Sequence, residues 1–534
     1  MPPCVIFEDD HLLVVNKPAG LNTHAPGPYA GEGLYDWLRH REPRWASLAI
    51  VHRLDKETSG VLVFSKSALA NRSLTEQFTR RNVRKRYVFL TDREMSKAKL
   101  SVKSCLVRSG EKYVSRPIHA GGILAETDFH AGARISEGTL AGLYEVWAEP
   151  LTGKTHQIRV HAAQSGVPIL GDTLYGGTAA KRVCLHAAQI EFEHPETGKV
   201  VTFRAAPGFE ADPRCVLREA LIEPDLTNAY RLINGATDGW HGWYVDRLGD
   251  YLLSQSERPL GGKETAELQR LLTDCRLTGA YHKLLTRQVR KTFGSDASPR
   301  LVLGEAAPEK FSVMENGLRF TLSFAEGYSV GLFLDQRDNR RRLLTGHVGA
   351  GFGLGPQRLR GLSVLNAFAY TCGFSVAAAK AGATTTSLDL SRKYLAWGRE
   401  NFTLNGLDPT AHEFIYGDVL DWLRRLAKKE RQFDVLLLDP PTFSQSKESG
   451  VFRVERDYGR LVSAALTLVR PGGLLFASTN AAKWEPEDFI RAVEQAVQAS
   501  GRKVLQRLFF PQPPDFPASK AEPGYLKTVW LKVA

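Results

Sequence analysis

Cysteine is scarce and scattered in this chain of 534 residues. Its six cysteines include no Cys-x-x-Cys pair, so the sequence predicts neither a disulfide framework nor a zinc site. No apolar run approaches the roughly 18 residues of a membrane helix, and the N-terminus lacks a basic region followed by an apolar core. We therefore expect a soluble cytoplasmic protein with no membrane span and no metal.

Positive charge is in excess, with a net charge of +12 and a pI of about 9.3. This balance favours a polyanionic partner. The charge gathers in two runs, each beside a candidate site, and each run either contacts RNA or forms a solvated helix face. The runs are Arg80, Arg81, Arg84, Lys85 and Arg86, then Arg337, Arg340, Arg341 and Arg342.

Length and composition predict several globular domains. At about 150 residues per domain the chain is long enough for three or four, and 43% hydrophobic with 24% charged residues is ordinary globular composition. Residues 209–224, with proline and charge, are typical of a connector. We predict domains at 1–215, 225–310 and 311–534.

The two later domains differ in pattern. Residues 231–256 alternate apolar and polar positions around glycine turns, which favours a small antiparallel sheet before a helix at 263–277. From Gly361 onward, apolar strands alternate with amphipathic helices, as in a parallel doubly wound sheet that ends in an antiparallel pair. The glycine-rich residues 349–355 precede the first strand and predict a flexible loop. The expected fold class is multidomain, combining α/β and α+β parts.

The segment His52–Gly60 reads HRLDKETSG and places one carboxylate between basic neighbours. Arg53 and Lys56 would bias Asp55 toward its charged form. Such a residue could attack as a nucleophile or accept a proton at neutral pH. An isolated string of this kind could equally be a surface turn with salt bridges.

Three further segments accompany it: Lys17–Gly20, Lys85–Tyr87 and Thr152–His161. In order and spacing the set resembles the RluA-type pseudouridine synthases over roughly the first 210 residues. The resemblance implies a mixed-sheet domain that isomerises uridine, with Asp55 as the catalytic residue and Arg159 paired with it. It implies that Tyr87 lies against the target base as a proton acceptor.

The same resemblance implies a set of basic residues that bind RNA. One of them, Lys154, replaces the arginine usual in the family, which keeps the charge but loses the two-pronged grip on phosphate. The expected RNA-binding residues are Arg53, Arg84, Lys85, Lys154 and His156.

A second site is predicted at the carboxyl ends of the later strands, where ligands bind in such sheets. Asp389, Asp418 and Asp439 each follow a strand. The first is placed for ribose hydroxyls and the second for an adenine amine, although Asp418 could equally cap the next helix. The loop Asn366–Gly373 contains one glycine and is weak as a dinucleotide fingerprint.

The segments Asp439–Phe443, Gly331–Arg337 and Phe452–Asp457 resemble, with this loop, the class I S-adenosylmethionine-dependent ribosomal RNA methyltransferases of the RlmI and RlmK group. The resemblance spans roughly residues 225–534 and implies a Rossmann-like domain, after a small α+β domain of EEHEE type, with Asp439 as a catalytic residue. Cys372 stands where the group usually has glycine. The implied cofactor-binding residues are Phe333, Gln336, Arg337, Asn366, Phe368, Tyr370, Thr371, Asp389, Asp418 and Asp439.

The methylated atom is predicted from a missing cysteine. Methylating C5 of a pyrimidine needs a thiolate that adds at C6, and no cysteine follows Cys372. The segment Ala477–Lys483 lacks the cysteine carried there by the C5-methylating RlmI branch, and it is closer to the RlmK branch, which makes 7-methylguanosine. Guanine N7 is the first choice and an exocyclic amine the second.

The leading hypothesis is a multifunctional isomerase and methyltransferase of ribosomal RNA, rather than of transfer RNA. Alternatives are a methyltransferase whose first domain only docks RNA, and an RNA chaperone in ribosome assembly. Asp55, Tyr87 and Arg159 together favour an active first domain, because a docking module needs none of them.

Overall fold

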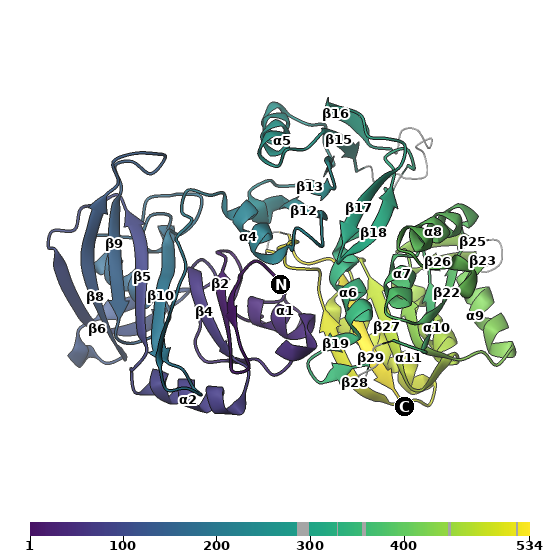
Figure 1. The fold of residues 1–534 in the computed structure, drawn as a ribbon, viewed down its shortest axis with the longest axis horizontal. Coiled ribbons are helices and arrows are strands. Elements are labelled where there is room, and N and C mark those ends of the chain that lie inside the picture. The colour runs from purple at the N-terminus through teal and green to yellow at the C-terminus, as the bar shows by residue number, and fades with distance from the viewer. Residues whose placement is uncertain (286–297, 328, 355–358, 447–449, 520–521) are drawn as a thin grey trace. The chain divides into compact units, whose positions relative to one another are not determined.

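The computed structural model describes the chain except residues 286–297, 328, 355–358, 447–449 and 520–521. It contains two compact units, coloured along the chain in Figure 1. The first consists of residues 1–25, 33–36 and 47–223, and the second of residues 26–32, 37–46 and 224–534. No helix in the described part of the chain is long and apolar enough to cross a bilayer.

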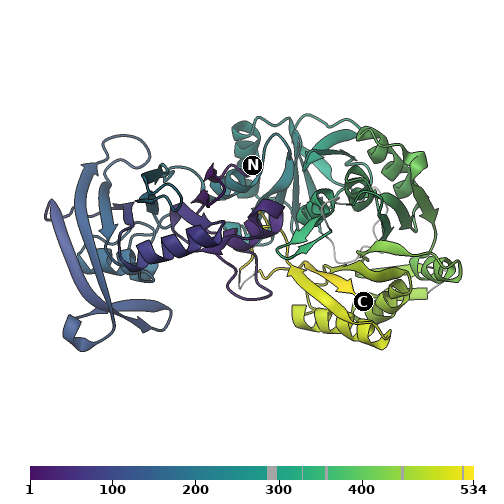
Figure 2. The same cartoon turned by 60° about the horizontal axis from the view of Figure 1, so that its bottom comes forward.

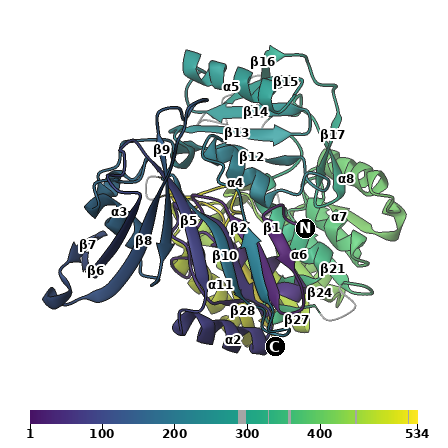
Figure 3. The ribbon, with the colours of Figure 1, turned by 60° about the vertical axis from the view of Figure 1, so that its left-hand side comes forward.

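The first unit is built on one mixed sheet, whose main strands lie side by side in Figure 3. The order is β1-β2-β4-β10-β5-β9-β8-β6-β7, with β11 beside β10 and β3 beside β4. Neighbours are antiparallel except β10 and β4, which are parallel. The strands are β1 (Val5–Glu8), β2 (Leu12–Lys17), β3 (Ala49–Ile50), β4 (Ser59–Ser65), β5 (Arg84–Thr91), β6 (Lys99–Ser109), β7 (Lys112–Arg116), β8 (Ile123–Arg134), β9 (Tyr144–Pro150), β10 (Leu185–Glu193) and β11 (Val200–Arg204).

Helices accompany this sheet, and side-chain caps at Ser67 and Asp212 start two of them. The helices are α1 (Leu34–Arg41, whose end belongs to the second unit), α2 (Ala68–Thr79), α3 (Gln157–Gln164) and α4 (Pro213–Leu221). Helix α4 corrects the prediction of a plain connector at 209–224. The side chain of Asp212 accepts a hydrogen bond from the Arg214 amide, and Pro213 occupies the first turn, so this stretch starts a helix.

The second unit begins with a five-stranded sheet in sequential order. It consists of β12 (Ala229–Asn234), β13 (Trp243–Leu248), β14 (Tyr251–Ser256), β15 (Gly279–Leu284) and β16 (Arg300–Gly304), with α5 (Gly262–Asp274) between β14 and β15. The antiparallel sheet predicted for residues 231–256 is confirmed for β12, β13 and β14, and β15, which follows α5, joins it parallel to β14. Helix α5 returns the chain to the starting end of the sheet, as a parallel connection requires.

The larger sheet of this unit has the order β23-β22-β21-β24-β27-β29-β28. The first five strands are parallel, and β28 and β29 add an antiparallel hairpin, yellow in Figure 2, as predicted. The strands and helices alternate as β21 (Ser363–Ala367), α7 (Gly373–Lys380), β22 (Thr384–Asp389), α8 (Arg392–Leu404), β23 (Glu413–Tyr416), α9 (Val419–Lys428), β24 (Phe433–Leu438), α10 (Val454–Leu466), β27 (Val469–Thr479), α11 (Pro486–Ala499), β28 (Val504–Phe510) and β29 (Lys527–Val533).

Short elements complete the unit. They are β17 (Phe311–Glu315) with β18 (Leu318–Leu322), α6 (Arg337–Thr345), β19 (His347–Gly349) with β20 (Phe352–Gly353), and β25 (Phe443–Ser446) with β26 (Gly450–Arg453). The predicted flexible loop at 349–355 is instead largely this β19–β20 hairpin, because Val348 and Phe352 are buried and Gly351 supplies the turn with a φ of 74°. Gly355 lies outside the described residues.

The boundary predicted at residue 310 stays a prediction. One hydrophobic core contains Leu253 and Tyr281, from the five-stranded sheet β12–β16, together with Phe320 of β18 and Val364 of β21. The two parts of the second unit therefore pack as one body.

Candidate active sites

The turn that carries Asp55 joins β3 to β4 and is held from both sides. The Thr23 hydroxyl donates to the Leu54 carbonyl at 2.8 Å and accepts from the Leu54 amide at 3.1 Å. The buried ammonium of Lys17 donates to the Lys56 carbonyl at 3.2 Å. Gly60 has a φ of 119°, and a Cβ there would meet the Ala187 carbonyl oxygen at 2.3 Å. The turn is therefore fixed in place, as a catalytic carboxylate requires.

Asp55 faces two basic side chains that are distant in sequence. Its Oδ2 lies 3.8 Å from Nη1 of Arg159 and 4.0 Å from Nε2 of His156. Burial raises the pKa of Asp55, and the charges of His156 and Arg159 oppose that rise without cancelling it. The prediction that Arg53 and Lys56 bias this carboxylate toward its charged form is wrong, because both side chains are exposed and burial dominates.

Arg159 makes its strongest pair with a residue that the sequence did not single out. Its Nε and Nη2 donate to the two oxygens of Asp172 at 2.7 and 2.8 Å. The remaining nitrogen, Nη1, faces Asp55, so the predicted pairing exists as a longer second contact. Asp172 is 1% exposed, and its sequence signal is slight: an acidic residue two positions after the apolar stretch 167–170. It orients the arginine that faces Asp55.

Tyr87 lies on β5, between Ala148 of β9 and Ala187 of β10. Burial, assisted by the charge of Asp55, raises the pKa of its phenol above the ordinary value, so the hydroxyl keeps its proton at neutral pH. The predicted role of proton acceptor stays a prediction, and this pKa runs against it.

The predicted RNA-binding residues of the first unit are mostly on the surface. The side chain of Arg84 is 85% exposed, and Arg53 and Lys154 are exposed as well. Lys85 is partly buried, which lowers its pKa to about 8. His156 is held by a hydrogen bond of 2.7 Å between its Nδ1 and the Tyr175 hydroxyl. Their contact with RNA stays a prediction.

In the second unit, the connection from β21 to α7 has an unusual backbone. Phe368, Tyr370 and Cys372 have φ values of 63°, 49° and 63°. Left-handed backbone costs a non-glycine residue roughly 1–2 kcal/mol, and such strain concentrates at functional sites. It also explains why glycine is usual at the position of Cys372 in the family that the sequence resembles.

Two carboxylates at neighbouring strand ends already have backbone partners. Asp389 accepts from the amides of Tyr370 at 2.8 Å and Ser391 at 2.9 Å. Each of its oxygens keeps a second lone pair for a ligand. Asp418 accepts from the Asp421 amide at 3.0 Å and caps α9, which confirms the alternative interpretation given above. Its contact with an adenine amine stays a prediction.

Asp439 directly follows β24 and is held by Gln336 of the 3₁₀ turn Leu334–Gln336. The Gln336 amide lies 3.3 Å from each oxygen of Asp439 and donates to the Ser478 hydroxyl at 2.8 Å. Burial raises the pKa of Asp439 to about 6, with a further rise from the nearby charge of Asp335. The structure thus places Gln336, a predicted cofactor ligand, on Asp439, whose catalytic role stays a prediction.

The other predicted cofactor-binding residues fall into two groups. Phe333 is 46% exposed, and its ring centroid lies 5.3 Å from that of Tyr370, so both rings border the site. Asn366 and Thr371 are buried; they donate to the Ser375 hydroxyl and to the Gly331 carbonyl, respectively. These two hold the connection in shape, and Asn366 belongs to strand β21 rather than to a loop.

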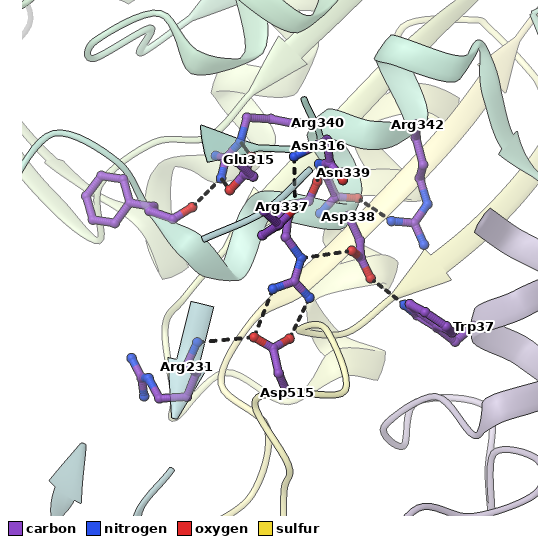
Figure 4. Close-up of polar contacts among 12 residues, drawn as sticks. Trp37, Arg231, Glu315, Asn316, Arg337, Asp338, Asn339, Arg340, Arg342 and Asp515 are labelled. Carbon is purple, nitrogen blue, oxygen red and sulfur yellow. Dashed lines mark hydrogen bonds and ion pairs between the residues drawn. The ribbon is translucent and has the colours of Figure 1, made fainter. Parts of the chain in front are cut away.

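The arginines of the basic run on α6 are buried or half-buried, and Arg337, Arg340 and Arg341 form ion pairs; Figure 4 shows the surroundings of Arg337 and Arg340. Arg337 donates to both oxygens of Asp515 at 2.9 and 2.6 Å, and Arg340 to both oxygens of Glu315 at 2.6 and 2.7 Å. Arg341 pairs with Glu42. Neither a solvated helix face nor an RNA contact fits these partners, so both interpretations of this run are wrong. The predicted cofactor contact of Arg337 stays a prediction without support from its surroundings.

We expect Arg337→Met to lower the free energy of unfolding by about 3–5 kcal/mol, because Asp515 is fully buried and would lose its bidentate cationic partner. Urea denaturation measures the change. Arg431→Met is the control: its ion pair with Glu413 is exposed and should contribute under about 1 kcal/mol. Equal effects of the two substitutions would contradict the prediction.

Comparison with known proteins assigns both units. A family model of S-adenosylmethionine-dependent methyltransferases matches residues 254–531, and a model of RNA pseudouridylate synthases matches residues 11–164. Ribosomal large subunit pseudouridine synthase C of Salmonella typhimurium is 39% identical over 233 residues, which are 40% of this chain and 70% of that protein. The chain joins a pseudouridine synthase domain to an S-adenosylmethionine-dependent methyltransferase domain.

Further relatives match the methyltransferase domain. Ribosomal RNA large subunit methyltransferase I of Klebsiella pneumoniae is 33% identical over 318 residues, 58% of this chain and 75% of that protein. The crystal structure of SMU.776, named as a methyltransferase and solved with S-adenosylhomocysteine, is 30% identical with a TM-score of 0.52. It covers 60% of this chain and 79% of that one. The Rossmann-like fold and the dependence on S-adenosylmethionine are thereby confirmed.

Proposed function

We propose that the chain modifies ribosomal RNA twice, isomerising a uridine at Asp55 and methylating guanine N7 at Asp439. The observation that carries the proposal is that each unit contains a carboxylate contacted by polar side chains distant in sequence: Arg159 and His156 for Asp55, and Gln336 for Asp439. The names of the relatives, which refer to the large ribosomal subunit, support ribosomal RNA as the substrate.

The first reaction breaks the C1′–N1 bond of uridine, turns the base and rejoins it through C5, which then loses its proton. Asp55 is the group that attacks or assists proton removal. Arg159 Nη1, 3.8 Å away, stabilises its negative charge during this step. The uridine must leave its stack to reach a carboxylate held in such a turn. Tyr87, protonated, supplies a ring face for the base.

The residues around the second site fit S-adenosylmethionine. When bound, this cofactor supplies a methyl group on a positively charged sulfur. Asp389 has lone pairs free for ribose hydroxyls, and the rings of Phe333 and Tyr370 offer apolar surface. Asp439 would offer its negative charge to the sulfonium, and the connection at 368–372, with its strained backbone, would help to hold the cofactor.

The chemistry of the thiols favours a nitrogen as methyl acceptor and the RlmK branch as the closer relative. Burial raises the pKa of Cys372 to about 12, so this thiol does not supply a nucleophilic thiolate. No cysteine follows it in the chain. Guanine N7 needs no activation, because it has a lone pair, and its methylation makes the base cationic. An ionised Asp439 stabilises that positive charge.

Mass spectrometry of ribosomal RNA tests the proposal. Cells lacking the gene should miss one pseudouridine and one 7-methylguanosine, and the wild-type gene should restore both. Loss of the methyl group alone would favour a first domain that only docks RNA. A missing 5-methylcytosine would contradict the nitrogen assignment, and unmodified RNA from both strains would contradict catalysis altogether.

The pKa of Asp439 predicts a pH dependence of methyl transfer. Its value of about 6 means that the carboxylate is ionised above pH 6 and protonated below it. We expect the methylation rate at saturating cofactor to fall about tenfold per pH unit below 6, because the protonated group no longer stabilises a cationic base. The rate at neutral pH of protein first held at pH 5 controls for acid damage; pseudouridine formation cannot, because burial raises the pKa of Asp55 as well. A rate independent of pH from 5 to 8 would contradict this role.

A further inference from the structure

A cavity of about 420 Å³ lies within the second unit, beside the methyl-transfer site. Its walls come from the β12–β15 sheet, from residues between 329 and 335, and from Gln512, Phe516, Glu522, Pro523 and Tyr525. The volume falls within the range of small-molecule pockets, roughly 300–1,000 Å³. It is large enough for a single nucleobase turned out of its stack.

One short turn, Leu334–Gln336, connects the lining of the cavity to Asp439. Asp335 lines the cavity and directly precedes Gln336, whose amide contacts both oxygens of Asp439 at 3.3 Å. The charge of Asp335 is close enough to affect the titration of Asp439. A base in this cavity therefore lies near the carboxylate that acts in methyl transfer.

Two aromatic side chains of the lining suit a base. Phe333 leaves 46% of its surface exposed, which is unusual for a large apolar side chain next to a core. Tyr244 of β13 lines the cavity as well. Proteins commonly hold unstacked bases against such rings.

Asp335 is the group in this lining that can read one edge of a base. A carboxylate accepts two hydrogen bonds side by side and donates none. Within the described part of the chain, Asp335 has the Tyr525 hydroxyl as a hydrogen-bond donor and makes no bidentate pair. The two other acidic residues of the lining already have partners: Asp246 accepts from Arg231 at 2.5 and 3.3 Å, and Glu522 accepts from the amides of Ala236 at 2.7 Å and Gly242 at 3.3 Å.

We propose that this cavity receives the target guanine and that Asp335 accepts hydrogen bonds from its N1–H and N2–H groups. Among the four bases, guanine alone presents two adjacent donor groups on that edge; adenine, cytosine and uracil each present one beside an acceptor. N7 lies on the other side of the purine ring, so a guanine held this way leaves N7 free for the methyl donor. The inference rests on the proposed function and adds the residue that determines base specificity.

Asp335→Asn tests the inference in the full-length protein. The amide replaces one acceptor by a donor, so we expect the methylation rate on ribosomal RNA from cells lacking the gene to fall about tenfold to a hundredfold. Binding of S-adenosylmethionine, measured by calorimetry, and pseudouridine formation should not change. Asp250→Asn, an exposed carboxylate in the turn after β13, is the matched control and should leave all three unchanged. Tyr525→Phe, which removes the hydroxyl on Asp335, should give a smaller fall.

A substrate change separates base recognition from a structural role. Once the methylated guanosine is located, inosine at that position removes only the N2 amine. The methylation rate of the wild-type protein should then fall about tenfold. The rate of the Asp335→Asn protein should be only slightly lower on inosine than on guanosine. Normal methylation by Asp335→Asn, loss of cofactor binding, or equal inosine effects on both proteins would overturn the inference and leave guanine methylation standing. A methyl group on another base would overturn the proposed function itself.

Discussion

Asp55→Asn is expected to abolish pseudouridine formation, by about 10⁴-fold or more, while methylation of the same RNA continues. The substitution keeps the size of the side chain and the turn held by Thr23 and Lys17. It removes the negative charge that attacks the nucleoside or assists proton removal, and loss of a group of this kind typically costs a large part of catalysis. Mass spectrometry of RNA from complemented cells measures both products in one sample.

The control for this variant is Asp10→Asn, which changes an exposed carboxylate of the same unit. It should restore pseudouridine fully. Equal pseudouridine levels from Asp55→Asn and wild type would show that Asp55 is not the catalytic group. Loss of both modifications would point to misfolding instead, and a urea denaturation curve would identify it.

Asp439→Asn is expected to lower the methylation rate by about 10²–10³-fold with pseudouridine formation intact. The buried carboxylate is aligned by Gln336 and stabilises the positive charge that develops on the methylated base. Removing one preorganised electrostatic partner typically reduces kcat by this amount. Because the amide keeps the volume, cofactor affinity should change less than the rate of methyl transfer.

Asp488→Asn is the matched control, since Asp488 is 53% exposed in side chain and lies on α11. Its methylation rate should equal that of wild type. A tenfold or larger loss of cofactor affinity in Asp439→Asn, with an unchanged rate at saturation, would assign Asp439 to cofactor binding alone.

Much of the fold followed from periodic sequence patterns. The alternation after Gly361 predicted the parallel sheet and its terminal antiparallel pair, because buried strands and amphipathic helices leave local signatures. Ser391 caps α8, accepting from the Tyr394 amide at 3.2 Å, and serine is among the residue types that favour this position. The failures occurred where a local pattern has two solutions: residues 349–353, predicted as a loop, belong to the β19–β20 hairpin, and residues 209–224 contain α4.

For the two candidate sites, too, the sequence predicted some residues and missed others. Ordered motifs pointed to Asp55 and Asp439, but no spacing rule pointed to Asp172 or Asp335. Burial reversed the expected pKa shift of Asp55, although its sequence neighbours are basic. Neighbours in sequence say little about the electrostatic surroundings of a side chain that turns inward.

The sequence by itself determined that two nucleic-acid chemistries share this chain, since short motifs carry reacting groups whose type and order the chemistry demands. Only the tertiary structure decided which charges are free to act. The arginines of α6 looked available for RNA, yet Arg337 is paired with Asp515, 178 residues away. A buried charge is stable only with such a partner, and folding alone brings the two together.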